Sequence, residues 1–555
     1  MKKHLFTCFL ASLCLYGSTT IAQVADSPPE TDLVDYSGIP GQEGASPSAR
    51  LGALIYGELI NPDSLAPLSL ELRQGLLAKG LFLSDSAFQV PLSHGTFFDG
   101  VLDPRVQKFQ VHIPLQEDFA LIELKIGQRS ILKDFLIYPA DSIKVGIDLQ
   151  EFKVVFAGPQ KMWFEAQYAI KRAQASAQFE GPRVLLEINR EALLDQQDYR
   201  QQVASQESVF GSRIAIYEFG KDGLDHELSL LMDSTLSSIP GWAALQEFRS
   251  SLPQERFHML QSQLTAAYYA EHLATFKQYH HGMPLALGDT TAATHARELI
   301  PMILEKLDLE LTESLTKGLN SGTIDLAREW IYSKKILSPE PLEQLIADKY
   351  MSPIREKLLL SILLKKVETA NIPPSEWQRY AEHLIASPLE KEFNTLKSTF
   401  ETNTYLSPAK FYSLAGNELS LKDFFGKPVL LYFYYSGCTH SANYFRNYLQ
   451  PFYQNQGMDL GLQVIAVSVD LDTDLWKSQL STYSSTAIIN LNLPGDEASD
   501  WLSHYRITGF PRSMLLDREG KVLSYTLDGR DFSEYSANIV SLLDSVQPVE
   551  NQMNH

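Results

Sequence analysis

The chain has 555 residues, of which 44% are hydrophobic, and its formal net charge is −20. This length suggests about three domains, and the hydrophobic fraction is sufficient for ordinary cores. The negative charge argues against binding to nucleic acids or to anionic membrane surfaces. The 13 histidines show no Cys/His spacing of a zinc site, and no phosphate-loop, HExxH or GxSxG motif is present. We therefore expect no cofactor and no metal.

Residues 1–22 form a predicted signal peptide. Lys2 and Lys3 precede an apolar run that ends near Tyr16, and Thr20-Ile21-Ala22 is a small-residue cleavage site. The run is shorter than the about 20 apolar residues of a transmembrane helix, and no later segment qualifies. We expect cleavage after Ala22, a charge change from −20 to −22 through loss of Lys2 and Lys3, and a periplasmic or cell-envelope location.

The next residues, 23–50, are rich in Ser, Pro, Gly and Asp, which predicts a disordered tether. Residues 51–158 then contain short runs of β-branched and aromatic residues between turn residues, a pattern that favours an antiparallel β-sandwich. The predicted strands are 53–57, 109–113, 120–124, 135–138, 143–147 and 154–156. The segment from Tyr138 to Val145 resembles a hairpin of the small β-rich domain that precedes thioredoxin-like modules in bacterial envelope proteins. This resemblance implies a docking or packing role.

Residues 160–400 change to a helical period. Apolar residues recur every three or four positions in 224–236, 257–276, 293–315 and 355–367, and prolines separate these segments. No fixed-period repeat is present, so a solenoid is not predicted. Nothing in this region indicates a function.

Residues 405–546 alternate between strand and helix patterns, which is typical of an α/β domain. A tail of residues 547–555 is expected to be disordered. The predicted fold class is thus a multidomain α+β protein with an N-terminal β-sandwich-like domain, a helical middle region and a C-terminal α/β domain. The predicted C-terminal strands are 429–435, 462–469, 488–491, 512–516 and 521–526, and the helices are 441–454, 473–482, 497–505 and 532–543.

Cys438 follows the first of these strands, where the chain passes into a helix. The N-terminus of a helix carries partial positive charge and free N–H donors, which favour a thiolate. Cys8 and Cys14 leave with the signal peptide, so Cys438 is the only cysteine of the exported chain. It can join another molecule, as an adduct or a Cys438-linked dimer, or stay free. The alternative is an inert buried cysteine.

Residues 411–545 resemble the extracytoplasmic thioredoxin-like family of thiol–disulfide oxidoreductases. The lead-in from Leu419 to Lys427, the strand that ends in the cysteine, and Ile507-Thr508-Gly509-Phe510-Pro511 followed by 515–520 carry this resemblance. It implies that Pro511 is cis and faces Cys438. It also implies that the main chain of Phe510 pairs with a substrate peptide as an added strand.

The motif differs from the family pattern at three positions. Ser441 stands where the second cysteine of Cys-x-x-Cys is expected, Gly437 replaces the tryptophan before the first cysteine, and Tyr432 replaces a buried acid. The resolving thiol and its proton acceptor are therefore absent together. His440 either stabilises the thiolate as an imidazolium or is an exposed first-turn residue. Ser441 either donates its hydroxyl to the thiolate or caps the helix.

The leading hypothesis is monothiol exchange with protein thiols or disulfides through Cys438, with release of the mixed disulfide by an external reductant. A second hypothesis is a non-catalytic thioredoxin-fold module that binds proteins around Pro511. A peroxiredoxin-like peroxidase is the third. It lacks the expected threonine, which is Tyr435 here, and the activating arginine, whose place Pro511 takes.

Overall fold

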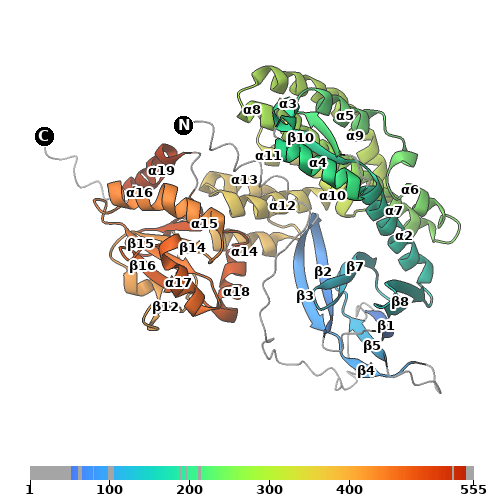
Figure 1. The fold of residues 1–555 in the computed structure, drawn as a ribbon, viewed down its shortest axis with the longest axis horizontal. Helices are drawn as coiled ribbons and strands as arrows, with labels where there is room; N and C mark the ends of the chain where they lie inside the picture. The colour runs from blue at the N-terminus through green and yellow to red at the C-terminus, as the bar shows by residue number, and fades with distance from the viewer. Residues whose placement is uncertain are drawn as a thin grey trace. The chain divides into compact units, whose positions relative to one another are not determined.

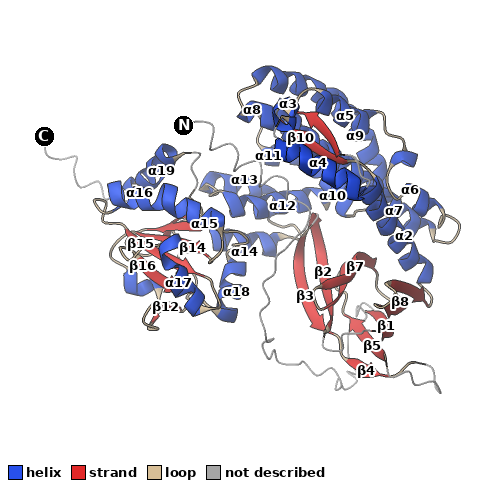
Figure 2. Ribbon diagram, in the orientation of Figure 1, coloured by secondary structure: helices blue, strands red, loops and turns tan. Residues whose placement is uncertain are grey.

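The computed structural model describes residues 52–60, 66–78, 80–97, 105–187, 189–195, 197–210, 214–527 and 531–545. The predicted signal peptide, tether and tail lie outside these residues. Along the described chain a β-rich region is followed by a helical region and then by an α/β region (Figures 1 and 2), which confirms the predicted fold class. No helix among the described residues is long and apolar enough to cross a membrane.

Two sheets form the β-rich region. Their strand orders are β4-β5-β1-β8-β9 and β3-β2-β6-β7. The strands are β1 (Ala53–Ile60), β2 (Leu68–Ala78), β3 (Leu81–Gln89), β4 (Leu92–His94), β5 (Val106–Ile113), β6 (Ala120–Ile126), β7 (Arg129–Ile137), β8 (Ser142–Asp148) and β9 (Lys153–Ala157).

Buried and half-buried side chains alternate along β1, and its inward residues share one core with those of β2. This period of two is the pattern of a sheet with one buried face, and the β-sandwich prediction is therefore confirmed. One detail differs from the expected antiparallel arrangement, because β1 pairs with β8 in parallel.

The start of the helical region packs into the core of the sandwich, and its later helices share a second core with the ends of β2 and β3 and with the α/β region. In α9, buried residues recur at three- and four-residue spacing from Ala293 to Leu311, as the sequence pattern predicts. A two-stranded parallel sheet, β10 (Arg183–Glu187) with β11 (Ile214–Glu218), was not predicted. The helices are α2 (Lys161–Glu180), α3 (Arg190–Leu194), α4 (Gln197–Phe210), α5 (Asp222–Met232), α6 (Trp242–Gln246), α7 (Gln254–Thr275), α8 (Met283–Ala286), α9 (Thr290–Lys317), α10 (Ser321–Leu337), α11 (Leu342–Lys349), α12 (Ile354–Thr369), α13 (Pro374–Leu384) and α14 (Glu390–Phe400).

The α/β region contains a seven-stranded sheet with the order β13-β12-β16-β15-β14-β17-β18. The central strand β14 pairs in parallel with β15 and antiparallel with β17. Every residue of β14 is buried, because helices cover both faces of the sheet. The strands are β12 (Phe411–Ser413), β13 (Glu418–Leu419), β14 (Val429–Tyr434), β15 (Gln463–Ser468), β16 (Ile489–Asn492), β17 (Arg512–Leu516) and β18 (Val522–Ser524). The main helices are α15 (Thr439–Tyr444), α17 (Thr473–Tyr483), α18 (Gly495–His504) and α19 (Phe532–Asp544).

The two faces of this sheet belong to different cores. Leu430 and Tyr432 face a core that includes residues of α15, α17 and α19. Leu431 and Phe433 belong to a core that continues into the helical region. At the end of α14, the ring of Phe400 lies 5.2 Å from that of Tyr525 and 6.4 Å from that of Tyr505. The predicted boundary near residue 400 therefore separates two patterns of secondary structure within a continuous core.

Candidate functional site

A tight, strongly bonded loop places Cys438 between β14 and α15. Gly437 has φ of 99°, a left-handed conformation that residues with a side chain rarely adopt. This explains why glycine, and not the family's tryptophan, precedes the cysteine. The N–H of Gly437 donates to the hydroxyl of Tyr483 at 2.7 Å. The N–H and hydroxyl of Ser436 donate to the carboxylate of Asp470 at 2.9 and 2.7 Å, which fixes the loop.

Cys438 is the N-cap residue of α15. Its Sγ accepts a hydrogen bond from the N–H of Ser441 at 3.4 Å. Helical turns continue without a break through η4 (Phe445–Leu449), α16 (Gln450–Phe452) and η5 (Tyr453–Gly457). The sulfur therefore meets one of the free N–H donors at the start of a long helical segment, where negative charge is favoured. The residue is 6% exposed.

The peptide bond between Phe510 and Pro511 is cis, as the family resemblance implies. The carbonyl oxygen of Phe510 lies 3.6 Å from the Sγ of Cys438 and accepts a hydrogen bond from the thiol. The structure thus brings Phe510 and Pro511 to the cysteine from a segment more than 70 residues away in the chain.

His440 and Ser441 occupy different environments. His440 is exposed in the first turn of α15 and has no hydrogen bond or ion pair with any described residue. Ser441 is fully buried, and its hydroxyl has no hydrogen-bond partner among the described residues. Neither predicted role of the Ser441 side chain is therefore found, because its main-chain N–H contacts the sulfur and Cys438 itself is the cap.

Tyrosines surround the base of the site. Tyr432, at the position of the family's buried acid, donates its hydroxyl to the carbonyl oxygen of Ser441 at 2.9 Å. Its ring stacks on those of Tyr434 and Tyr444. Burial raises the pKa of Tyr432 well above its usual range, so the phenol stays neutral. A neutral phenol that is already bonded cannot replace a carboxylate as a proton acceptor.

Two further functional candidates, Tyr435 and Asp470, were not predicted. Tyr435 is 43% exposed beside the cysteine, and its ring meets that of Phe510 edge to face at 5.6 Å. Burial and the negative charge of a Cys438 thiolate raise the pKa of Tyr435. The signal in the sequence that could have identified Tyr435 is its position three residues before the cysteine. Asp470 lies after β15, 34 positions from its partner Ser436, so no local pattern links the two.

Comparisons with known proteins agree with the observed fold. Residues 426–522 match a family model described as thioredoxin-like. No curated protein matches the chain. Cys438 and cis-Pro511 lie within the matched segment, and most strands of the seven-stranded sheet lie within it too. The C-terminal domain is therefore thioredoxin-like.

Solved structures similar to the chain include thiol–disulfide oxidoreductases of Bacteroides. The thioredoxin domain of one from Bacteroides vulgatus is 29% identical, with 26% of this chain and 97% of that chain covered and a TM-score of 0.23. A thiol:disulfide interchange protein from Bacteroides sp. is 28% identical, with 28% of this chain and 99% of that chain covered and a TM-score of 0.24. A thiol–disulfide oxidoreductase from Bacteroides fragilis is 20% identical, with 25% of this chain and 100% of that chain covered and a TM-score of 0.21. Because these TM-scores are low, the assignment of the C-terminal domain as thioredoxin-like depends on the family match and on the sheet topology.

Proposed function

We propose that this is an exported cell-envelope protein whose thioredoxin-like domain performs monothiol thiol–disulfide exchange through Cys438. The observation that carries the proposal is the position of the Cys438 sulfur, which accepts the Ser441 N–H at the start of α15 and contacts the Phe510 carbonyl before cis-Pro511. A thiolate is the nucleophile in disulfide exchange. The same place in the structure therefore offers stabilisation of the charge and a backbone edge for the substrate.

The exchange proceeds in two steps. In the first, the Cys438 thiolate attacks one sulfur of a substrate disulfide, a new S–S bond forms, and the other substrate sulfur leaves as a thiolate that takes up a proton. In the second, the thiolate of an external thiol attacks the mixed disulfide, joins the substrate sulfur and releases Cys438. Ser441 cannot perform this second step, because a hydroxyl does not exchange with a disulfide. The external thiol is therefore part of the proposed cycle.

Phe510 is assigned to substrate positioning. An extended peptide can pair with an exposed backbone edge as an added strand. The Phe510 carbonyl is held at 3.6 Å from the sulfur, so a peptide paired there presents its own cysteine beside Cys438. The ring of Phe510 meets that of Tyr435 edge to face, so two aromatic side chains lie together near the thiol.

The burial of Cys438 favours a second candidate function, a non-catalytic module that binds proteins at the same surface. At 6% exposure the thiol is shielded, and the exposed His440 makes no hydrogen bond or ion pair with the thiol or any other described residue. In this case the fold and the main chain of Phe510 would be used for binding, and Cys438 would be a core residue.

Non-reducing electrophoresis of the exported protein distinguishes these functions. We expect a Cys438-dependent adduct or dimer that disappears on reduction and in Cys438→Ala, because no second cysteine of the mature chain competes for the thiol. The His440→Ala variant should form the same adduct, since no hydrogen bond or ion pair joins the exposed His440 to a described residue. A free-thiol monomer that captures the same partners in wild type and Cys438→Ala would favour the binding module.

A further inference from the structure

A cavity of about 380 Å³ is lined in part by Phe510 and Pro511, and the carbonyl of Phe510 contacts Cys438. One wall is residues 506–513, which include the segment that we call the cis-proline loop, 506–511. The opposite wall is the C-terminal turn of α12, residues 368–369, from the helical region. Tyr444 of α15 and residues 526–527 after β18 complete the lining.

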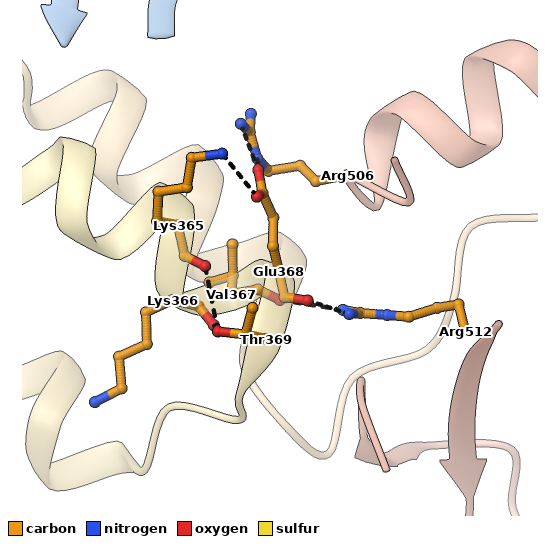
Figure 3. A network of polar contacts seen from close by, with 7 residues as sticks. All are labelled: Lys365, Lys366, Val367, Glu368, Thr369, Arg506 and Arg512. Carbon is orange, nitrogen blue, oxygen red and sulfur yellow. Dashed lines mark hydrogen bonds and ion pairs between the residues drawn. The ribbon is translucent and has the colours of Figure 1, made fainter. Parts of the chain in front are cut away.

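Ion pairs and main-chain hydrogen bonds join these two walls (Figure 3). The carboxylate of Glu368 accepts hydrogen bonds from the guanidinium of Arg506 at 2.9 and 3.1 Å, and from Lys365 at 3.1 Å. The guanidinium of Arg512 donates to the main-chain oxygens of Val367, at 3.2 Å, and Glu368. Arg512 thereby binds carbonyls at the end of α12, which have no partner within the helix. The helical region thus fixes the geometry of the cis-proline loop.

Positive charge dominates this network. Among the charged residues that line the cavity, Arg506 and Arg512 contribute two positive charges and Glu368 one negative charge, a local sum of +1, whereas the whole chain carries −20. Lys365 pairs with Glu368 from outside the lining. The remaining lining is rich in hydroxyls, including Ser513, which donates to the hydroxyl of Tyr444 at 2.8 Å. A polar cavity with a net positive lining favours a small anionic group and disfavours an apolar one.

The cavity and the thiol share one residue. Phe510 lines the cavity, and its carbonyl oxygen lies 3.6 Å from the Cys438 sulfur. A group attached to a sulfur that reacts with Cys438 therefore lies next to a residue that lines the cavity. Arg506 is the charged group that such a substituent meets, because its side chain is 29% exposed while Arg512 is buried against the carbonyls of α12.

We propose that this cavity binds a carboxylate carried by the disulfide substrate, that Arg506 is its main ligand, and that Glu368 orients Arg506. The helical region thereby supplies the specificity-determining wall of the thioredoxin-like site. This inference depends on the proposed exchange at Cys438. The carboxylate belongs either to a small acidic disulfide or to an acidic residue that flanks a cysteine in a peptide, and both present the same group to Arg506.

The test compares rates of reaction of the reduced mature protein with two coloured disulfides. 5,5′-Dithiobis(2-nitrobenzoate) carries carboxylates and 4,4′-dithiodipyridine is neutral; each forms a mixed disulfide with Cys438 and releases one aromatic thiol, which is measured by absorbance. The ratio of the two rates is compared between proteins, so the different leaving groups cancel. Arg506→Gln should lower the anionic-to-neutral ratio about tenfold, because it removes a unit charge at contact distance.

Two further variants separate charge from structure. Glu368→Gln removes the negative charge but keeps a side-chain oxygen that can accept from Arg506, so Arg506 stays oriented, the network becomes more positive, and the ratio should hold or rise. Lys521→Gln removes the same charge just before β18, at the opposite end of the β17–β18 hairpin, and should leave the ratio unchanged. Equal ratios in all four proteins would overturn the proposal, as would an equal fall in Arg506→Gln and Glu368→Gln.

A pair of cystine peptides identifies the source of the carboxylate. The peptides differ only in Glu or Lys beside the cystine, and their reactions are followed by mass. A preference for the Glu peptide that Arg506→Gln removes identifies an acidic protein segment. A charge preference limited to the small disulfides identifies a small acidic disulfide, and either result supports the proposal. Failure of every disulfide to react with the folded wild-type protein would refute the exchange function itself.

Discussion

Replacing Ser441 with cysteine should convert the monothiol site into a dithiol site. Ser441 is three residues after Cys438 in the first turn of α15, and its N–H already contacts the Cys438 sulfur at 3.4 Å. A disulfide requires Cα atoms about 4.4–6.8 Å apart. Cys438 is the N-cap and Ser441 the third residue of the same helix, and a cap hydrogen bond holds these two positions close together. The new thiol therefore reaches Cys438 without a large movement of the main chain.

The expected gains in insulin reduction and in stability follow from two features of the site. The resolving attack becomes intramolecular, so reduction of insulin in the presence of a dithiol reductant should rise roughly tenfold or more. The buried hydroxyl of Ser441 has no partner among the described residues, and an unsatisfied buried polar group costs about 1–3 kcal/mol. The reduced variant should therefore have a free energy of unfolding about 1 kcal/mol above that of the wild type.

Ser441→Ala is the matched control, because it also removes the hydroxyl but adds no thiol. It should share the gain in stability and show no gain in insulin reduction. If Ser441→Cys is folded and equally inactive, the reasoning is refuted. Tyr432 in place of the acid and Gly437 in place of the tryptophan would then already prevent exchange. A fall in stability in both variants would show that the Ser441 hydroxyl has a partner in solution.

Three other perturbations test the shared core, a buried histidine of the helical region and the loop before the cysteine. Phe400→Ala should lower the free energy of unfolding by about 3–5 kcal/mol in denaturant titration, because Phe400 is 4% exposed in the shared core. The same change at Phe179, which is 73% exposed, should cost less than about 0.5 kcal/mol. Burial lowers the pKa of His280 to about 4, so the unfolded chain takes up its proton first and stability falls as pH drops from about 6.5 to 4. The Nδ1 of His280 accepts a hydrogen bond from the Gly220 N–H, so His280→Asn, which keeps an acceptor, should remove up to roughly 3 kcal/mol of this pH dependence. Asp470→Asn should lower stability by about 1–3 kcal/mol and change the alkylation rate of Cys438, because the loop before the cysteine loses charge-assisted bonds.

The sequence was most informative about the thioredoxin-like domain, where local patterns coincide with the fold. β14 is a continuous apolar run bounded by turn residues, and a strand buried on both faces requires that pattern. The alternation of Leu68, Leu70 and Leu72 in β2 carries an equally clear period-two signal, although no strand was predicted there. The exposed polar residues of β3 gave no such signal.

The features that sequence reasoning missed depend on contacts between distant residues. Glu368 and Arg506 are 138 positions apart, and nothing near either one indicates the other. Phe400 ends a helix with an ordinary amphipathic pattern, and only the folded chain shows that it covers Tyr505 and Tyr525. The sequence patterns alone indicate a separate α/β domain at residues 405–546, which corresponds to a fragment starting near Asn403. We now expect such a fragment to be unstable, because it lacks Phe400, whereas a fragment starting near residue 350 retains it.

The central claim is that folded Cys438 exchanges with disulfides and cannot release the product without help. The most direct measurement is the intact mass of the reduced mature protein after exposure to a small disulfide under native conditions. We predict a mass increase of one half-disulfide that persists through buffer exchange, is lost on addition of an external thiol, and does not form in Cys438→Ala. Addition that occurs only after the protein is unfolded in denaturant would contradict the account, because the thiol would then be an inert core residue.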